Sequence, residues 1–497
     1  MPELRARTAL RRTAAVVAGC ALLAGASPAA GPASAVGTGV ARAGADTAGL
    51  AAFVDSVMAA EMRGEHVPGA VFVFVQDGRV VYQRGYGLAN VAERRAADPE
   101  TTIWRIGSIS KTFTALAVVQ LADRGRVDLR ADVNRYLTRV RVPGGYPLPV
   151  SVRDLLTHTS GLDEIRPGTQ APSADQVLPL ADFLRPRLAR VRPPGVTISY
   201  STYGITLAGA LVEEVTGTPF ERYLRENVWL PLGMRRTSVA VPPELRRDLA
   251  MGYERQGDSL QAQEWEWYHT IPASSINSTA ADMARYMIAF LQQGRPGEGR
   301  VLSDTAAREM LRQQAAPHPL VPGVTLGLWE DYVGGLRVVE HGGNVAGFSS
   351  QMTLIPSENA GFFVVNHLEN SRLRDNLRDA LLKRLYPAAR TRRPVPPPPA
   401  DFGARAAAYT GRYGWTASCH SCRPSTVSVV LPVTVRDDAL FIAGNRWIEV
   451  APLLFVRHDG SGYISFRTDS AGRPAEMFPG SFWSFERLPE ASTPLGP

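Results

Sequence analysis

The sequence predicts an α/β (α+β) fold: a mixed antiparallel sheet flanked by helices, with an all-helical region inserted into it, followed by a small C-terminal all-β domain. Runs typical of strands lie near both ends of residues 49–388, and the region between them reads mostly as helices and loops. Strands at both ends indicate one sheet assembled from chain-distant pieces. A Pro-rich run within residues 389–400 then separates this unit from residues 401–497.

The first elements of the sheet are expected to be a helix and a hairpin. Apolar residues recur at helical spacing directly after residue 49, namely Leu50, Phe53, Val54, Val57 and Met58. Two apolar runs with β-branched and aromatic residues, 70–75 and 80–82, flank Asp77-Gly78. Because Asp-Gly suits a primed turn, this segment predicts a strand, a tight turn and a second strand.

The sheet pattern returns late in the same unit. Three strands and a closing helix are expected at Leu336–Glu340, Phe348–Ile355, Gly361–Asn366 and Leu373–Leu385. After the Pro-rich spacer, short alternating runs occur at 427–430, 440–442, 454–456 and 464–466. These runs predict a small all-β module of about 95 residues, a size that can hold a core of its own.

The N-terminus has the pattern of a targeting segment. Arginines precede a mostly apolar run at 14–26, and a small-x-small cleavage pattern ends at Ala35. The apolar run is too short to span a bilayer. We therefore expect a signal peptide at 1–35 and a flexible leader at 36–48, which predicts a secreted or extracytoplasmic protein with no transmembrane helix in the mature chain. A lipoprotein box that ends at Cys20 leaves a lipid anchor open as an alternative.

The charge of the chain argues against a nucleic-acid partner. Lys and Arg number 54 and Asp and Glu number 47, which gives a formal net charge of +7. Four arginines and one acid lie in the first 35 residues; they include Arg11-Arg12, which also leaves a twin-arginine signal open. The remaining excess of about +4 is too weak and too diffuse for nucleic-acid binding.

The pair Cys419 and Cys422 leaves three alternatives open: a local disulfide, a redox pair or half of a zinc site. Zinc needs about four ligands, and the chain has no second Cys-x-x-Cys. In an exported chain the local disulfide is favoured.

Several common signatures are missing: the phosphate-binding and dinucleotide-binding glycine loops, His-Glu-x-x-His and Gly-x-Ser-x-Gly. The chain instead carries Ser108-x-x-Lys111 at the start of an apolar helix. Spacing of three residues puts the hydroxyl and the amine on one helix face. The helix N-terminus offers free N–H groups and positive potential, which stabilise an oxyanion and favour a neutral amine. A neutral amine can accept the Ser108 proton, whereas Arg cannot act as a base; only two lysines occur, Lys111 and Lys383.

Two further segments belong to the same pattern. Tyr200 lies in Ser199-Tyr-Ser-Thr-Tyr-Gly204 at a predicted loop-to-helix junction, and His341-Gly-Gly-Asn344 precedes the strand predicted at Phe348–Ile355. Glycines at 342 and 343 would let a substrate backbone lie close to that strand. In this order, the three segments resemble the penicillin-binding-protein and class C β-lactamase superfamily of serine hydrolases.

The resemblance covers roughly residues 49–388 and includes three accessory segments: Leu155–Leu162, Pro231–Met234 and Ser278–Ala284. The C-terminal module, which opens with Tyr409–Tyr413, resembles a lipocalin-like β-domain.

The resemblance implies a role for each site residue. Ser108 is the nucleophile, and Lys111 and Tyr200 handle its proton and that of the leaving group. His341 matches the first position of the family's Lys-Thr-Gly or His-x-Gly triplet on the substrate-side strand, where Gly343 lies. The backbone N–H groups of Ser108 and Asn344 form the oxyanion hole. No metal or organic cofactor is expected, and the partner is a small ester, amide or peptide substrate.

Three positions depart from the family pattern. Thr202 stands where Tyr-x-Asn has Asn, and its hydroxyl is shorter and offers one donor. His341 replaces a Lys that favours a substrate carboxylate, and a mostly neutral imidazole anchors a carboxylate less well. Ser274-Ser275 replaces a usual Gly-Gly. The first two departures weaken the case for penicillins and D-Ala-D-Ala peptides.

The leading interpretation is an exported esterase or amidase. A D-stereospecific peptidase or carboxypeptidase, a β-lactamase and a peptide-cyclising acyl transferase stay open within the same chemistry. A catalytically silent protein that binds cell-wall fragments is the alternative outside it; the intact Ser108, Lys111 and Tyr200 speak against that alternative.

Overall fold

The computed structural model describes residues 49–257, 259–292, 300–333, 335–387, 395–422, 427 and 429–489. The expected signal peptide, the leader and the alternative lipid anchor at Cys20 lie outside the described residues, as does part of the Pro-rich spacer. Within the described ranges, no helix is both long enough and apolar enough to cross a membrane.

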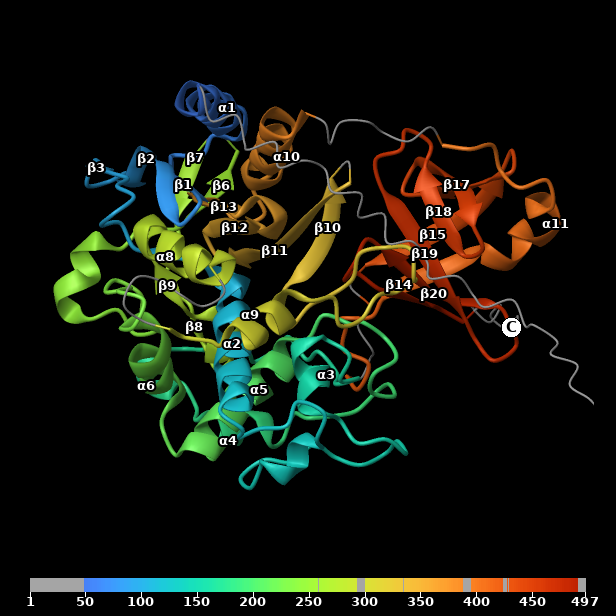
Figure 1. The fold of residues 1–497 in the computed structure, drawn as a ribbon, viewed down its shortest axis with the longest axis horizontal. Coiled ribbons are helices and arrows are strands. Elements are labelled where there is room, and N and C mark those ends of the chain that lie inside the picture. The colour runs from blue at the N-terminus through green and yellow to red at the C-terminus, as the bar shows by residue number, and fades with distance from the viewer. Residues whose placement is uncertain are drawn as a thin grey trace, which may run out of the picture. The chain divides into compact units, whose positions relative to one another are not determined.

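Seven strands form the main sheet, in the order β10-β11-β12-β13-β1-β2-β3 (Figure 1). Their bounds are β1 (Gly69–Gln76), β2 (Arg79–Asn90), β3 (Arg95–Ala96), β10 (Trp329–Val333), β11 (Leu336–Val345), β12 (Phe348–Ile355) and β13 (Ala360–His367). Antiparallel pairing of β1 with β13 places Val73 opposite Phe363. This pairing joins the early and late strands of the chain and confirms the predicted sheet. Asp77 and Gly78 both have positive φ, 49° and 78°, as the predicted primed turn between β1 and β2 requires.

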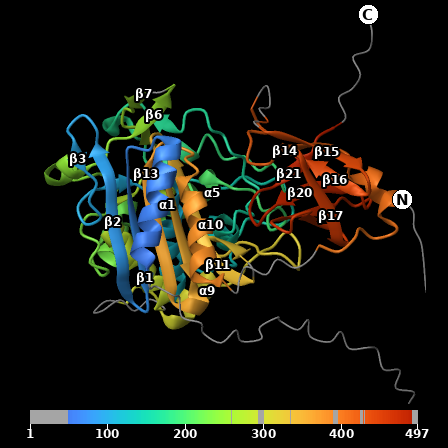
Figure 2. The ribbon, with the colours of Figure 1, turned by 90° about the horizontal axis from the view of Figure 1, so that it is seen from above.

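The two faces of the sheet are covered by different helices, because successive side chains of a strand point to opposite faces. Phe72 and Phe74 pack with α1 (Leu50–Glu65) and α10 (Leu373–Leu385), which lie along one face (Figure 2). Val71 and Val73 belong to the core cluster that contains α2 (Ser110–Asp123) and α8 (Ala280–Leu291). The sheet flanked by helices is therefore confirmed.

The inserted region lies between β3 and β10 and is mainly helical. Besides α2 and α8 its α-helices are α3 (Val152–Leu156), α4 (Leu180–Leu184), α5 (Thr202–Thr216), α6 (Phe220–Leu224), α7 (Ile271–Ser274) and α9 (Asp304–Leu311). Its shorter helical turns are η1 (Gly107–Ile109), η2 (Val133–Arg135), η3 (Ala174–Gln176), η4 (Arg225–Trp229) and η5 (Pro243–Asp248). Three strand pairs complete it: β4 (Trp104–Arg105) with β9 (Asn277–Ser278), β5 (Gln170–Ala171) with β8 (Trp267–Tyr268), and β6 (Tyr253–Gln256) with β7 (Ser259–Ala262).

A closed barrel of eight antiparallel strands forms the C-terminal all-β domain. Its strands are β14 (Gly411–Trp415), β15 (Val430–Arg436), β16 (Ala439–Ile442), β17 (Asn445–Ala451), β18 (Leu454–Arg457), β19 (Tyr463–Thr468), β20 (Pro474–Pro479) and β21 (Phe485–Arg487). β14 pairs with β21 and so closes the barrel over a core that includes Tyr413, Phe455 and Phe466. The expected strand at 427–430 begins only at Val430, and Ser428 lies outside the described residues.

Of the three alternatives for the cysteine pair, the structure has the local disulfide. Cys419 and Cys422 are bonded to each other. They lie in the segment between β14 and β15.

Candidate active site

Ser108 lies in the turn η1, directly before the buried helix α2. Gly107 precedes it with a φ of +54°, and a Cβ at Gly107 would lie 2.9 Å from the backbone nitrogen of Asn344. Glycine therefore allows this turn to approach β11 closely. The sequence predicted Ser108 at the start of the helix; the structure places it two residues earlier, in η1, with α2 beginning at Ser110.

Lys111 faces Ser108 from the first turn of α2. Its Nζ lies 3.0 Å from Ser108 Oγ and donates a hydrogen bond of 2.9 Å to the carbonyl oxygen of Ala273 on α7. The side chain is 1% exposed, and Nζ lies 4.9 Å from the centroid of the Tyr200 ring. Three distant segments of the chain thus surround one amine, and the predicted Ser108, Lys111 and Tyr200 come together. The Ser274-Ser275 pair directly follows Ala273 at the end of α7.

Tyr200 lies in the short segment that enters α5, and backbone hydrogen bonds hold this segment. Ser199 N–H donates to the carbonyl oxygen of His158 at 2.8 Å, and Ser201 N–H donates to His158 Nδ1 at 3.1 Å. Thr202 N–H donates to Glu164 Oε2 at 2.8 Å. Burial raises the pKa of Glu164, while a hydrogen bond from the Thr202 side chain opposes that rise. Thr202 is therefore engaged with Glu164, which the sequence-based role of Thr202 in substrate binding did not include.

His341 lies on β11 and is 1% exposed. Its Nδ1 lies 2.7 Å from the carbonyl oxygen of Gly342, so Nδ1 carries the hydrogen and donates it. Burial, followed by the nearby charge of Lys111, holds the pKa of His341 well below the ordinary value. A neutral imidazole is consistent with the expectation that this position anchors a carboxylate poorly.

The two glycines after His341 make room for the protein's own groups. A Cβ at Gly343 would lie 2.1 Å from the carbonyl oxygen of Ile106 and 2.5 Å from Ser350 Oγ. A Cβ at Gly342 would lie 3.3 Å from a guanidinium nitrogen of Arg374. The sequence attributed these glycines to close approach of a substrate; at Gly343 the packing against the residue Ile106 before Ser108 is a sufficient reason for glycine.

Asn344, the expected oxyanion-hole residue, has its side chain fixed. Its Oδ1 accepts hydrogen bonds from Ser349 Oγ at 3.0 Å and from Asn370 N–H at 3.1 Å. The backbone of Asn344 lies close to the turn that carries Ser108, since a Cβ at Gly107 would meet its nitrogen, carbon and oxygen. The structure thus brings the two backbone donors of the expected oxyanion hole onto adjoining segments.

Sequence reasoning missed an aromatic cluster beside His341. The Trp329 ring, at the start of β10, lies 4.3 Å from the His341 ring and 4.2 Å from the Phe482 ring, measured between centroids. The Phe482 ring also lies 6.2 Å from the Tyr200 ring. Phe482 belongs to the segment between β20 and β21 of the barrel. No local pattern could have identified these residues, because they lie far apart in the chain.

Residues of the barrel domain also bind Asp163, the neighbour of Glu164. Asp163 is 2% exposed and accepts hydrogen bonds from His420 N–H at 2.9 Å, Ser421 N–H at 2.8 Å and Ser421 Oγ at 2.6 Å. These donors lie inside the loop closed by the disulfide. Asp163 directly precedes Glu164, so the barrel contacts the same stretch that supports α5.

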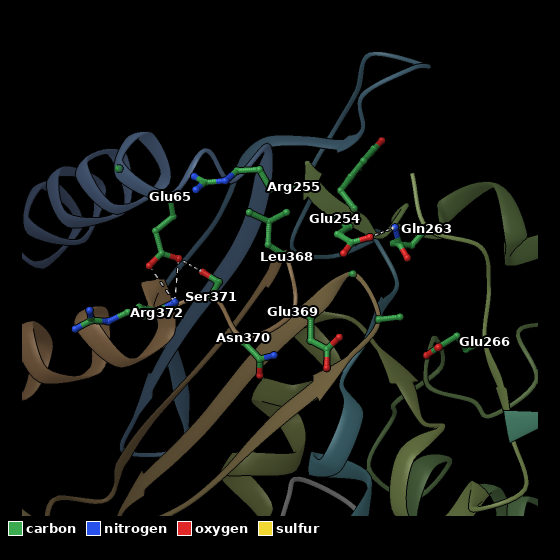
Figure 3. A pocket seen from close by; sticks show the side chains of 14 residues that line it. Glu65, Glu254, Arg255, Gln263, Glu266, Leu368, Glu369, Asn370, Ser371 and Arg372 are labelled. Carbon is green, nitrogen blue, oxygen red and sulfur yellow. Dashed lines mark hydrogen bonds between the residues drawn. The ribbon is translucent and has the colours of Figure 1, made fainter. Parts of the chain in front are cut away.

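The cavity drawn in Figure 3 has a volume of about 740 Å³ and lies elsewhere. None of Ser108, Lys111, Tyr200 and His341 lines it. Its glutamates include Glu254, Glu266 and Glu369, and burial together with the two neighbouring carboxylates raises the pKa of Glu369. Asn370, which donates to Asn344, also lines this cavity.

Comparison with known proteins identifies the family and the fold of this chain. The family model described as Beta-lactamase matches residues 54–386. Protein flp from Staphylococcus aureus (strain MRSA252) is 27% identical over 331 residues, which are 64% of this chain and 63% of that protein. The chain thus matches slightly less than two thirds of the length of that relative.

Two solved structures share the fold. SurE superposes with a TM-score of 0.63 at 24% identity and covers 88% of this chain and 100% of its own. The octameric penicillin-binding protein homologue from Pyrococcus abyssi has a TM-score of 0.57 at 22% identity and covers 88% of this chain and 99% of its own.

Proposed function

We propose, from the premise that this chain belongs to the beta-lactamase family, that it is a serine hydrolase that cleaves small esters or amides through an acyl-enzyme on Ser108. The observation that carries the proposal is the contact of 3.0 Å between the buried Lys111 Nζ and Ser108 Oγ, with the Tyr200 ring beside the amine. A nucleophile within hydrogen-bond reach of a base is the arrangement that acyl transfer needs.

The reaction follows from these positions. Ser108 Oγ bonds to the acyl carbon while its proton passes to Lys111 Nζ. The backbone N–H groups of Ser108 and Asn344 stabilise the negative oxygen of the tetrahedral intermediate. The bond to the alcohol or amine then breaks, and the leaving group takes the proton through Lys111 and Tyr200. Water attacks the acyl-enzyme in the same way and restores Ser108, releasing the acid.

The neutral state of His341 indicates which class of substrate the site prefers. A buried imidazole whose pKa is held well below the ordinary value offers no positive charge to a substrate carboxylate at pH 7. We therefore favour acyl groups that lack a carboxylate at this subsite, which places esters and simple amides before penicillins.

Export is also part of the proposal, and it rests on the sequence pattern of residues 1–35. Export is tested by expressing the full chain in a bacterium and sequencing the N-terminus of the protein recovered outside the cytoplasm. A first residue at Val36 supports cleavage after Ala35, and an intact Met1 contradicts export by a cleaved signal.

Labelling with two reagents tests the enzymatic proposal. Wild type and Ser108→Ala are treated in parallel with a fluorescent fluorophosphonate and a fluorescent penicillin. We expect fluorophosphonate to label wild type and not Ser108→Ala, with little penicillin labelling. Labelling by both reagents would favour a penicillin-type site, and absence of Ser108-dependent labelling would favour a silent binding protein.

A further inference from the structure

Tyr200 places its ring beside the Lys111 amine, and among the described residues no hydrogen bond of its hydroxyl fixes it there. Its side chain packs against the apolar core of the barrel and contacts the rings of His158, His341 and Phe482. Ring contacts tolerate sliding, whereas hydrogen bonds fix direction. The position of Tyr200 therefore depends on what holds its backbone.

One residue holds the backbone on both sides of Tyr200. The carbonyl oxygen of His158 accepts from Ser199 N–H at 2.8 Å, and its Nδ1 accepts from Ser201 N–H at 3.1 Å. The His158 ring itself lies 4.8 Å from the Tyr200 ring, measured between centroids. We infer that His158 is a positioning residue that sets the place of Tyr200 in the proposed acyl transfer.

The backbone of His158 is adapted to this task. It has a φ of 57°, in the left-handed region that residues other than glycine seldom adopt. This conformation directs the carbonyl and the ring of one residue to the same short segment. Asn and His tolerate this region better than most side chains, which matters for the choice of variants.

The protonation state of the ring agrees with the geometry. His158 is 5% exposed, and burial together with the charge of Lys111 lowers its pKa to about 3. Nδ1 therefore keeps its lone pair near neutral pH and can accept from Ser201 N–H, with the ring hydrogen on Nε2. His158 is not placed to take a proton from Ser108, because Lys111 occupies that position.

A second histidine makes the same kind of bond away from the site. His269 Nδ1 accepts from Leu178 N–H at 3.0 Å, its ring lies 5.0 Å from the Phe183 ring, and it is 8% exposed. Neither of these two contacts is with a proposed catalytic residue. His269 is therefore a matched control for loss of a buried histidine that accepts a backbone hydrogen bond.

The inference rests on the proposed function and is tested with paired variants of the full chain. His158→Asn keeps an acceptor at the δ position and suits a positive φ, whereas His158→Leu removes the acceptor and leaves Ser201 N–H unpaired. The rate constant and the final stoichiometry of fluorophosphonate labelling are measured for both, and for His269→Asn and His269→Leu.

We expect His158→Leu to slow labelling by about tenfold or more, since a misplaced group at the site of reaction lowers the rate by at least that factor. The final stoichiometry should stay at the wild-type level, His158→Asn should label within about threefold of wild type, and both His269 variants should match wild type. A merely structural role would instead lower the stoichiometry of the labelled protein and leave the rate of the folded fraction unchanged. If His158→Leu does not fold, His158→Ala takes its place with the same expectation.

Hydrogen exchange, measured by mass spectrometry, tests whether His158 holds the backbone around Tyr200 and needs no measurement of activity. Amide exchange in residues 199–204 should rise in His158→Leu and return toward wild type in His158→Asn, while His269→Leu should raise exchange around residue 178 only. Unchanged exchange in 199–204, or a wild-type labelling rate in His158→Leu, overturns the inference. Failure of wild type to label at Ser108 contradicts the proposed function instead, and the exchange result then still decides the role of His158.

Discussion

The two halves of the candidate site are built in different ways. Ser108 and Lys111 are three residues apart, and a single helical turn brings Lys111 Nζ to 3.0 Å from Ser108 Oγ. Tyr200 reaches the same amine from a distant segment, whose backbone bonds to His158 and Glu164 and whose tyrosine ring lies beside the barrel's Phe482. The first half depends on local geometry and the second on tertiary contacts. Substitutions at Ser108 or Lys111 should therefore reduce activity most. Substitutions of residues that contact Tyr200 or its segment should reduce activity less.

The largest effect is expected at Lys111. Lys111→Arg should lower kcat/KM for any ester substrate nearly as much as Lys111→Ala, by about 10²- to 10⁴-fold, because Arg keeps the charge but cannot accept the Ser108 proton. The only other lysine, Lys383, is exposed on α10, and Lys383→Arg should leave the rate unchanged. Substantial activity in Lys111→Arg would mean that Lys111 acts only through its charge.

Removal of the Tyr200 hydroxyl should have the next largest effect. Tyr200→Phe keeps the ring contacts with His158 and Phe482 and removes only the proton-carrying group. We expect kcat to fall by about 10²-fold with little change in KM. Tyr203→Phe is the control: Tyr203 is three residues further along, and its hydroxyl donates to the carbonyl oxygen of Ile165. That control should lower thermal stability and spare kcat, and equal losses of kcat in both variants would contradict the role of Tyr200.

A smaller effect is expected from the barrel. Phe482→Ala removes the ring that packs on Trp329 and Tyr200, so it should change the preference between bulky aromatic and acetyl esters by about tenfold and leave Ser108 labelling intact. Phe441, a half-buried barrel residue whose ring lies 4.2 Å from the Arg436 guanidinium, supplies the control Phe441→Ala. Identical ester preferences in Phe482→Ala and wild type would remove the barrel from the substrate path.

The smallest expected effect is on stability at mildly acidic pH. Burial lowers the pKa of His367 to about 3, so below about pH 6.5 the unfolded chain binds a proton there that the folded chain does not. Stability is therefore lost as pH falls from about 6.5, and His367→Asn should reduce the slope of the unfolding free energy between about pH 6 and 5 by about 1 kcal/mol per pH unit. Denaturant unfolding at several pH values measures this slope, and an unchanged slope would show that His367 is protonated in the folded protein.

The sequence allowed the fold and the local half of the site to be predicted. The apolar runs at 70–75 and 361–366 predicted strands that the structure pairs as β1 and β13, and α10 begins and ends at the predicted residues. The spacing of Ser108 and Lys111 was informative because a helical turn fixes the distance between its residues. Tyr200 and His341 were identified only through a family resemblance, since neither has a local pattern that implies catalysis.

The remaining features depend on contacts between distant residues. Trp329 and Phe482 are adjacent in space and far apart in the chain, so no periodicity relates them. Gly343 was interpreted as a contact with substrate, whereas the carbonyl oxygen of Ile106 fills that space. All predicted catalytic residues precede the Pro-rich spacer. The barrel nevertheless contacts the site region, through Phe482 beside Tyr200 and through His420, which donates to Asp163.

The central claim is that turnover passes through an acyl group on Ser108, assembled by a local lysine and a remotely supported tyrosine. Its most direct test is denaturing mass spectrometry of the enzyme quenched during turnover of a slowly deacylated ester, followed by peptide mapping. We expect an added acyl mass on the peptide that contains Ser108, with more of it when deacylation is slowed, and none in Ser108→Ala. Turnover without any covalent adduct, or an adduct on a peptide that lacks Ser108, would contradict it.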